Sequence, residues 1–414
     1  MAVVRPFRGI RPHTELVDRV ASLPYDVMNR EEAKDMAKGN PYSFLHVVRS
    51  EIDMEDEQNP YDQAVYEMAR RNLDKMIEEN ILVQDEQPKY YIYRQMMFGR
   101  VQTGIVGCTS IDDYIHDVIK KHEFTRPAKE VDRIHNFDYC DANTAPIFLT
   151  YRRNETLNTI IRDHIKFNKP LYQFTSEDDI MHVVWDICDE AVINRIHQIF
   201  EGIDYLYIAD GHHRSASAVK VGLKRRENTD YTGEEEFNYF LSVIFPDEDL
   251  FIMDYNRVVK DLNGNSTEEF LDKIKENFTI ELYEEGSYRP SKKQTYGMYL
   301  EGHWYKLTAK EHITHKDNIV ERLDVALLQD NLLGPILGIE DPRTDKRIDF
   351  VGGIRGLEEL ERRVQHDMKV AFAMYPTTID DLMDVADTGE VMPPKSTWFE
   401  PKLRSGLFVH RLSD

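Results

Sequence analysis

Residues 204–222, DYLYIADGHHRSASAVKVG, concentrate polar groups that could bind an anion. An apolar run ends at Asp210, and a run of small residues compatible with a helix begins at Ser215. This order predicts a strand, a turn and a helix, with His212 and His213 at the helix N-terminus. Unpaired backbone N–H groups and the positive end of the helix dipole favour an anion there.

Three further features of this turn suit a ligand. Arg214 offers a forked donor for phosphate or carboxylate. Gly211 lets the backbone approach a ligand closely, and Asp210 could hold Mg²⁺ or a hydroxyl group. A purely structural interpretation, in which Asp210 pairs with Arg214 and the histidines cap the helix, stays open. Zinc is not expected, because adjacent histidines lack i, i+4 spacing and the chain has no HExxH motif.

A second polar segment, VIKKHEFTRPAKEVDRIHN, covers residues 118–136 and shows no apolar periodicity. We therefore expect a surface segment, where functional sites are often built. Its carboxylate Glu123, beside His122 and near the cation Arg126, could act as a general base on a substrate hydroxyl or hold an ammonium group. The alternative is a solvated run of charges.

Two weaker segments could contribute substrate contacts. The loop LPYDVMN contains Tyr25 and Asp26, and the C-terminal segment MPPKSTWFEPKLRSGL contains the cations Lys395 and Arg404 as well as Lys402. The hydroxyl groups and cations of the tail resemble an anion-binding segment. A tail strand that docks on a sheet would explain the same residues without a ligand.

The elements that must position these groups alternate between helices and strands. Asn29 followed by acidic residues predicts a helix start, and residues 60–80 show the spacing of an amphipathic helix. Residues 89–114 predict a β-hairpin with its turn near Gly99, and residues 44–48 predict a short strand. Several hairpins within this alternation favour an α+β fold with mixed sheets.

Charge and composition exclude several classes of protein. The chain has 414 residues and a formal charge of −23, so a nucleic-acid partner is not expected. The apolar runs are too short for a membrane helix, and the first residues lack the core of a signal peptide. Three widely spaced cysteines give no disulfide framework. We expect a cytoplasmic protein of two domains, residues 1–250 and 251–414, with the tail strand a candidate to return to the first.

The combination of these segments resembles a known family. ADGHHR, HEFTRP, LPYDVMN, NPYSFLHV and MPPKSTWFEPKLRSGL together look like a large microbial family catalogued as a domain of unknown function. That family in turn is similar to the free L-serine kinases, which have a ParB/sulfiredoxin-like domain. The resemblance implies such a nucleotide-binding module within residues 1–250 and an additional α+β region after it.

The resemblance also implies an activity. The kinases phosphorylate serine to O-phosphoserine with ADP or ATP, a DGHHR turn grips nucleotide phosphate, and a Glu in an earlier His-Glu segment activates the serine hydroxyl. Carried over, the turn is Asp210–Arg214, that is Asp210, Gly211, His212, His213 and Arg214, and the catalytic pair is His122 and Glu123. Mg²⁺ with ATP or ADP would be the cofactor, and Asp210 a candidate metal ligand.

Three functions compete at this point. The first is a phosphotransferase acting on serine or a similar small metabolite. The second is a non-catalytic, nucleotide- or metabolite-binding regulatory protein of the ParB-like lineage. The third, a DNA-binding protein of that lineage, conflicts with the charge of −23. The sequence does not choose between ATP and ADP, and it does not set the oligomeric state.

Overall fold

In the computed structural model, which describes residues 1–55, 57–125 and 127–413, long apolar runs form the centre of a nine-stranded sheet. Every residue of β8 (Ile147–Tyr151) and of β12 (Tyr239–Pro246) is buried. Continuous burial is typical of strands that are covered on both faces. Because β8 pairs parallel with β12 and antiparallel with β11 (Leu206–Asp210), the sheet is mixed.

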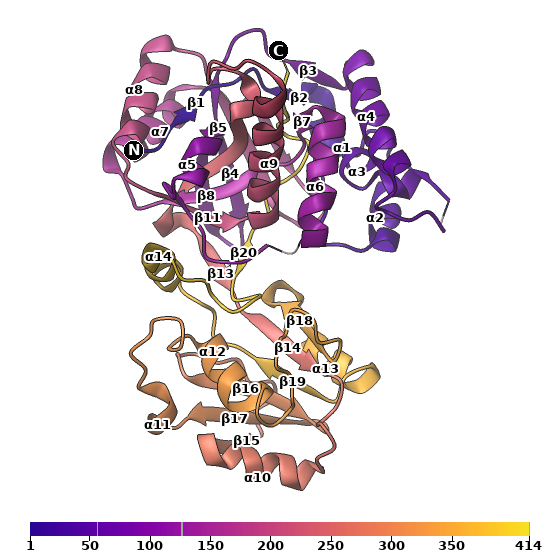
Figure 1. Cartoon of the computed structure of the whole chain (residues 1–414), viewed down its shortest axis with the longest axis vertical. Coiled ribbons are helices and arrows are strands. Elements are labelled where there is room, and N and C mark those ends of the chain that lie inside the picture. Colours follow the sequence, from indigo (N-terminus) through magenta and orange to yellow (C-terminus); the bar gives the residue numbers. More distant parts are fainter. Residues whose placement is uncertain (56, 126, 414) are drawn as a thin grey trace. The chain divides into compact units, whose positions relative to one another are not determined.

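The chain forms two compact units (Figure 1). Unit 1 comprises Met1–Lys121, Thr125–Leu250 and Pro401–Asp414, and unit 2 comprises His122–Phe124 and Phe251–Glu400. Both units combine helices with sheets, so the α+β class with mixed sheets is confirmed. The ParB/sulfiredoxin-like assignment stays a prediction.

The large sheet of unit 1 runs in the order β6-β11-β8-β12-β5-β4-β10-β9, and β1 pairs with β5. The predicted hairpin is confirmed, because β4 and β5 pair antiparallel. The remaining strands of unit 1 are β1 (Val4–Arg5), β2 (Ile10–Pro12), β3 (Leu82–Gln84), β4 (Tyr90–Met97), β5 (Arg100–Ser110), β6 (Ile119–Lys120), β7 (Ala142–Asn143), β9 (Tyr172–Thr175), β10 (Met181–Ile187) and β21 (His410–Arg411).

The helices of unit 1 confirm some expectations and correct others. They are α1 (Val17–Val20), α2 (Arg30–Ala37), α3 (Leu45–Val48), α4 (Gln63–Glu78), α5 (Ile111–Ile115), α6 (Pro127–Cys140), α7 (Glu155–Phe167), α8 (Glu190–Glu201) and α9 (His212–Asn228). Asn29 caps α2 by accepting the N–H of Glu32, as its position predicts. The strand expected at residues 44–48 is wrong, since these residues form α3. The polar segment from Pro127 onward is also a helix, α6.

Unit 2 is built on a six-stranded antiparallel sheet in the order β15-β17-β16-β19-β14-β18. Its strands are β13 (Phe251–Met253), β14 (Tyr255–Val259), β15 (Phe278–Tyr283), β16 (Thr295–Leu300), β17 (His303–Ala309), β18 (Ile348–Gly352), β19 (Val370–Ala373) and β20 (Trp398–Glu400). Its helices are α10 (Thr267–Asn277), α11 (Glu311–Thr314), α12 (Asp324–Leu328), α13 (Glu358–His366) and α14 (Ile379–Thr388). Strand β16 is buried along its whole length.

The last residues of the chain are part of unit 1. Strand β21 pairs with β7, and backbone bridges join Val409 to Ile10 and Ser405 to Ser22. These bonds fix a segment that follows unit 2 in the sequence onto the first unit's own strands.

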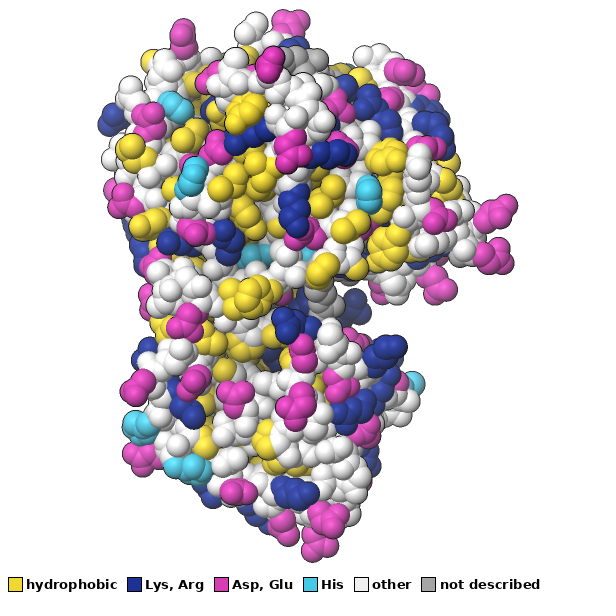
Figure 2. Space-filling view, viewed as in Figure 1, with side chains coloured by type: hydrophobic (Ala, Val, Ile, Leu, Met, Phe, Trp, Pro, Cys, Tyr) yellow, Lys and Arg dark blue, Asp and Glu magenta, His cyan; other side chains and the backbone are white. Residues whose placement is uncertain are grey.

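The face of the molecule drawn in Figure 2 carries charges of both signs. Figure 2 shows Asp and Glu side chains distributed among Lys and Arg over the face that is drawn. Within the described residues, no helix has both the length and the apolar character needed to cross a membrane.

Candidate functional site

The Asp210–Arg214 turn joins β11 to α9, as the order of residues predicts. Gly211 has a φ of 100°, a backbone conformation that favours glycine. A Cβ at this position would lie 3.1 Å from the Cζ atom of Arg214. The turn therefore depends on glycine for both its backbone angle and its packing against the arginine.

Arg214 is anchored deep within unit 1. Its side chain is 3% exposed, and Nη1 donates a hydrogen bond to the carbonyl oxygen of Pro146. Its Nη2 lies 3.7 Å from Oδ1 of Asp210. Its Nε has no hydrogen-bond partner among the described residues. The backbone carbonyl thus holds a permanent positive charge beside the start of α9.

Lys402 supplies a second cation to the same carboxylate. Its Nζ lies 3.0 Å from Oδ2 of Asp210, although the two residues are 192 positions apart in the sequence. Burial opposes ionisation of Asp210, but the charges of Lys402 and Arg214 outweigh it and hold the pKa of the carboxyl below its usual value. The Asp210 side chain keeps 28% exposure, so it is within reach of a ligand.

A buried polar network fixes the tail that carries Lys402. The Arg404 guanidinium is 4% exposed, pairs with Asp178, and donates from Nε to Nε2 of His182 at 3.3 Å. Burial, together with the charge of Arg404, lowers the pKa of His182 to about 3, so the ring is neutral. The side-chain amide of Gln95 donates to the carbonyl oxygen of Lys402 at 2.9 Å. These bonds set the position of Lys402 relative to the sheet.

The two histidines of the turn differ in burial. His212 is buried, and burial lowers its pKa to about 3, so it is neutral at pH 7. His213 follows it in α9 and is partly exposed. Arg214, Lys402 and the helix N-terminus supply positive character to the turn.

Tyr25 lies in the same electrostatic environment as the turn. Its ring is buried beneath the Arg133 guanidinium, whose Cζ lies 3.9 Å from the ring centroid. Burial raises the pKa of Tyr25, against the opposing charges of Arg133 and Arg214. Tyr25 also lines a cavity of about 290 Å³ in unit 1, together with Arg49, Glu51, Asp132 and Arg133 among others. Its neighbour Asp26 is exposed.

The remaining predicted residues do not belong to unit 1 or lie outside the description. His122 and Glu123 group with unit 2, where the Met392 N–H donates to the carbonyl oxygen of His122 at 2.8 Å. Lys395 is also in unit 2, with its Nζ 5.7 Å from the ring centroid of Tyr255. Arg126 lies outside the described residues.

The sequence names Lys402 among the cations of the tail but does not pair it with Asp210. The concentration of cations in the tail is the signal for this segment, and Lys395 and Arg404 are the residues predicted to contact substrate. Among the described residues, no group of three or more His, Cys, Asp and Glu side chains could hold a metal ion. Asp210 thus offers a single carboxylate to a cation at the turn.

Comparison with known proteins adds a family. The family model described as "Protein of unknown function (DUF1015)" matches residues 4–326. No curated protein matches this chain.

Several solved structures resemble parts of the fold. A free serine kinase mutant in complex with AMP has 14% identity and a TM-score of 0.39, with 72% of this chain and 89% of that chain covered. A conserved hypothetical protein from Pyrococcus furiosus has 16% identity and a TM-score of 0.36, with 71% and 92% covered. SbnI with a C-terminal truncation, from Staphylococcus aureus, has 10% identity and a TM-score of 0.40, with 74% and 87% covered. Similarity of this extent does not assign an activity to the chain.

Proposed function

The chain belongs to the DUF1015 family of proteins of unknown function, and we propose that it is a phosphotransferase. It moves a phosphoryl group from ATP or ADP to the hydroxyl group of serine or a similar small metabolite. The observation that carries this proposal is the pairing of Asp210 with both Lys402 and Arg214 at the start of α9. Two cations and a helix N-terminus converge there on one partly exposed carboxylate.

Such an arrangement suits a polyphosphate. Phosphoryl transfer depends on positioning and on neutralisation of the charge on the phosphate oxygens. Gly211 lets the phosphate approach the N–H groups of the first turn of α9, and Lys402 is near enough to Asp210 to share its charge with an incoming phosphate. Arg214, held by the Pro146 carbonyl, adds a fixed charge that needs no rearrangement on binding.

The donor set also fits a magnesium ion that arrives with the nucleotide. Mg²⁺ usually binds one or two carboxylates together with phosphate oxygens and water, and Asp210 is one such carboxylate. When bound, the ion would neutralise charge on the phosphate oxygens. Asp210 is then the residue that would hold it.

Glu123 is assigned as the general base on the family resemblance, with His122 beside it. The acceptor oxygen attacks the terminal phosphorus, its proton passes to the Glu123 carboxylate, and the bond from phosphorus to the leaving nucleotide oxygen breaks. Tyr25, Asp26, Arg126 and Lys395 are kept as proposed substrate contacts.

Arg404 receives a different role from the one that the sequence suggests. Because its guanidinium is buried against Asp178 and His182, we assign it to the positioning of Lys402 rather than to contact with substrate. This assignment explains why a cationic tail with a buried arginine accompanies the turn.

The direct test is a product assay. The protein is incubated with Mg²⁺, ATP or ADP and a panel of hydroxyl amino acids, and the phosphorylated amino acid is measured. We expect product from the wild-type protein and a loss of about 10²- to 10⁴-fold in Glu123→Gln, with nucleotide affinity nearly unchanged. Glu284→Gln, at an exposed position of unit 2, is the matched control.

The competing function is nucleotide binding without turnover. Measurable nucleotide binding with no product from any acceptor would favour a regulatory protein and contradict the kinase proposal. Equal loss of nucleotide affinity in Glu123→Gln and Arg214→Ala would contradict the roles that separate the base from the phosphate site.

A further inference from the structure

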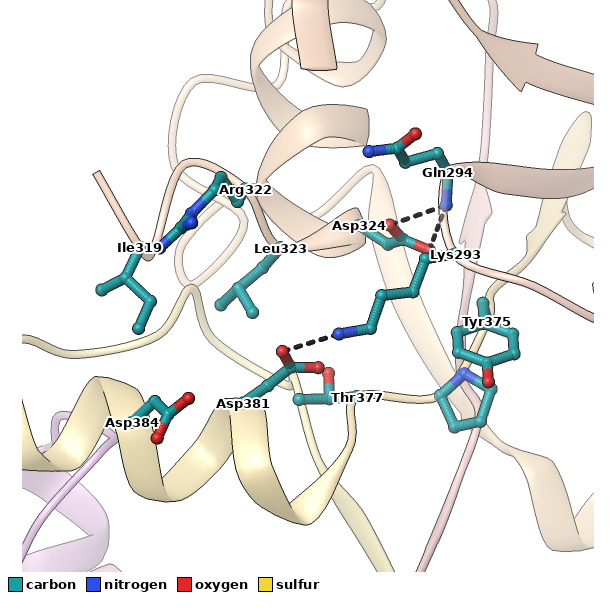
Figure 3. A pocket seen from close by; sticks show the side chains of 11 residues that line it. Lys293, Gln294, Ile319, Arg322, Leu323, Asp324, Tyr375, Thr377, Asp381 and Asp384 are labelled. Carbon is teal, nitrogen blue, oxygen red and sulfur yellow. Dashed lines mark hydrogen bonds and ion pairs between the residues drawn. The ribbon is translucent and has the colours of Figure 1, made fainter. Parts of the chain in front are cut away.

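Unit 2 contains a cavity of about 300 Å³ that the proposed phosphotransferase reaction does not use (Figure 3). Its apolar lining comes from Ile319, Leu323, Tyr375 and Pro376. Its charged lining comes from Lys293, Arg322, Asp324, Asp381 and Asp384. A cavity of this size with both kinds of lining is suited to a small metabolite.

Asp324 is the buried group of this cavity. It begins α12 and is 9% exposed. Both carboxyl oxygens accept the same backbone N–H, that of Gln294, each at 2.9 Å (Figure 3). No other side-chain hydrogen bond of Asp324 occurs among the described residues. An ionised carboxylate has about four acceptor sites, so most of the capacity of Asp324 is unused.

The neighbouring lysine does not serve this carboxyl. Figure 3 shows Lys293 directed at Asp381, and its Nζ lies 2.7 Å from Oδ1 of that residue. Asp381 also accepts the N–H and hydroxyl of Thr378 at the start of α14. Lys293 and Asp381 thus neutralise each other.

The other charged groups of the cavity differ in burial. Asp324 and Asp384 line the cavity on the acidic side, and Arg322 lines it on the basic side. Arg322 is exposed and forms no ion pair or hydrogen bond with any described residue. Once Lys293 and Asp381 are set aside, Asp324 remains as a buried carboxyl group with no cation paired to it among the described residues, whereas Arg322 is exposed to solvent. This favours a cationic group beside Asp324.

We propose that this cavity binds a small metabolite through an ammonium group that donates hydrogen bonds to Asp324. The carbon body of the ligand packs on Ile319, Leu323 and the ring of Tyr375. A carboxylate at the far end of the ligand, where one is present, pairs with Arg322. This binding function is separate from the phosphotransferase reaction and does not depend on it.

The ionisation of Asp324 gives the site a pH dependence. Burial raises the pKa of Asp324 to about 7, against the opposing charge of Lys293 and with a further upward effect from Asp381. The other titratable groups around it are Asp384, Arg322 and Tyr375 in the cavity and Tyr296, whose hydroxyl donates to the Asp324 carbonyl oxygen. An ammonium ligand binds the ionised carboxylate, so its affinity rises with pH through this range.

A matched set of three compounds tests the chemistry of the ligand. n-Butylamine, 4-aminobutyrate and butyrate share a four-carbon body that is short enough for the cavity, and they carry an ammonium group, both end groups, or only a carboxylate. Each is titrated into the full chain while the amide resonance of Gln294, whose N–H is bonded to Asp324, is followed by NMR. We expect both amines to move this resonance and butyrate to leave it in place.

Variants and a pH series test whether Asp324 and Arg322 bind the ligand. Asp324→Asn should weaken n-butylamine by at least about tenfold, whereas Asp317→Asn, at an exposed position of unit 2, should not change its affinity. Arg322→Met should weaken 4-aminobutyrate without weakening n-butylamine. For the wild-type protein, the affinity for n-butylamine should rise about tenfold between about pH 6 and about pH 8, where the amine itself stays charged.

Three results would overturn the proposal. They are a response to butyrate equal to that of n-butylamine, no response to any of the three compounds, and an affinity for n-butylamine that does not rise with pH. The pH series uses only the wild-type protein, so the outcome stands even where Asp324→Asn does not fold. Phosphoryl transfer without amine binding would contradict this proposal alone. Amine binding without phosphoryl transfer would contradict the kinase proposal alone.

Discussion

Two aspartates, one in each unit, have opposite electrostatic environments. Asp210 follows the buried strand β11 and is paired with the cations Lys402 and Arg214, which hold its pKa below the usual value. Asp324 begins the buried helix α12 and has one backbone N–H for both oxygens, so burial raises its pKa to about 7. The same side chain is thus permanently charged in unit 1 and only partly ionised at neutral pH in unit 2.

From this difference we infer which sign of ligand charge each site favours. At Asp210 the surrounding cations exceed the one carboxylate, and the helix N-terminus adds further positive character, so an anion such as phosphate is favoured. At Asp324 the lysine nearby is already neutralised by Asp381, so a cation is favoured. We therefore infer that the cations paired with Asp210, and the lack of one paired with Asp324, favour ligands of opposite charge at the two sites.

The largest effect is expected where the pair in unit 1 is broken. Lys402→Met leaves Arg214 as the remaining cation beside Asp210. Because Asp210 keeps this cation and is partly exposed, the free energy of unfolding of unit 1 should fall by about 3 kcal/mol, the lower end of the range for a broken buried pair. Amide hydrogen exchange of β11 measures this change. Lys169→Met, at an exposed position of unit 1, is the control. Equal protection of β11 in the two variants would show that the pair does not stabilise the turn.

The second effect is a change in the stability of unit 2 with pH. Because the folded pKa of Asp324 is raised, this group makes unit 2 more stable as pH falls, and the effect is complete near its unfolded pKa of about 4. Between about pH 8 and about pH 5 the gain should be about 2–3 kcal/mol, and Asp324→Asn should abolish it. Hydrogen exchange of β16, compared at the two pH values, checks this. A pH dependence that persists in the variant would contradict the raised pKa.

Asp210 should respond to pH in the opposite direction. Its folded pKa is lowered, so its stabilising contribution is present above the unfolded pKa of about 4 and is lost only as pH falls below that value. Between about pH 5 and about pH 8, the stability of β11 should therefore not vary through Asp210. Over this pH range, the stability of β16 should therefore change through Asp324, whereas that of β11 should not change through Asp210.

The smallest effect is expected at the ion pair between Arg404 and Asp178. Asp178→Asn removes the charge that Arg404 pairs with but keeps a hydrogen-bond acceptor, so the loss of stability should be about 1 kcal/mol. If Arg404 positions Lys402, the nucleotide affinity of this variant, measured by calorimetric titration, should fall by a few-fold. The nucleotide affinity of Arg404→Lys should fall further. An unchanged nucleotide affinity in both variants would show that Arg404 does not position Lys402 for nucleotide binding.

The sequence is informative where structure is local. Asp210, Gly211 and Arg214 are placed in a strand, a turn and a helix by the order of apolar, glycine and small residues alone. Asn29 likewise marks the start of α2. These features depend on a few neighbouring residues, so their residue types carry enough information.

Other features depend on contacts that the sequence does not display. Lys402 pairs with Asp210 across 192 positions, and no local pattern predicts such a contact. The apolar residues of α3 were expected to form a strand, because a short buried run fits a strand or a helical turn equally well. Helix α6 escaped detection because it buries Glu130, Asp132 and Arg133, so charged residues occupy the face where apolar ones were sought.

The measurement that tests the central claim most directly is calorimetric titration of ATP with Mg²⁺ into Arg214→Ala and into Arg195→Ala, an exposed arginine of unit 1. If the Asp210–Arg214 turn binds the phosphates, the dissociation constant should rise about 10- to 100-fold in the first variant and stay at the wild-type value in the second. Equal affinity in the two variants would contradict the assignment of the turn as the phosphate site.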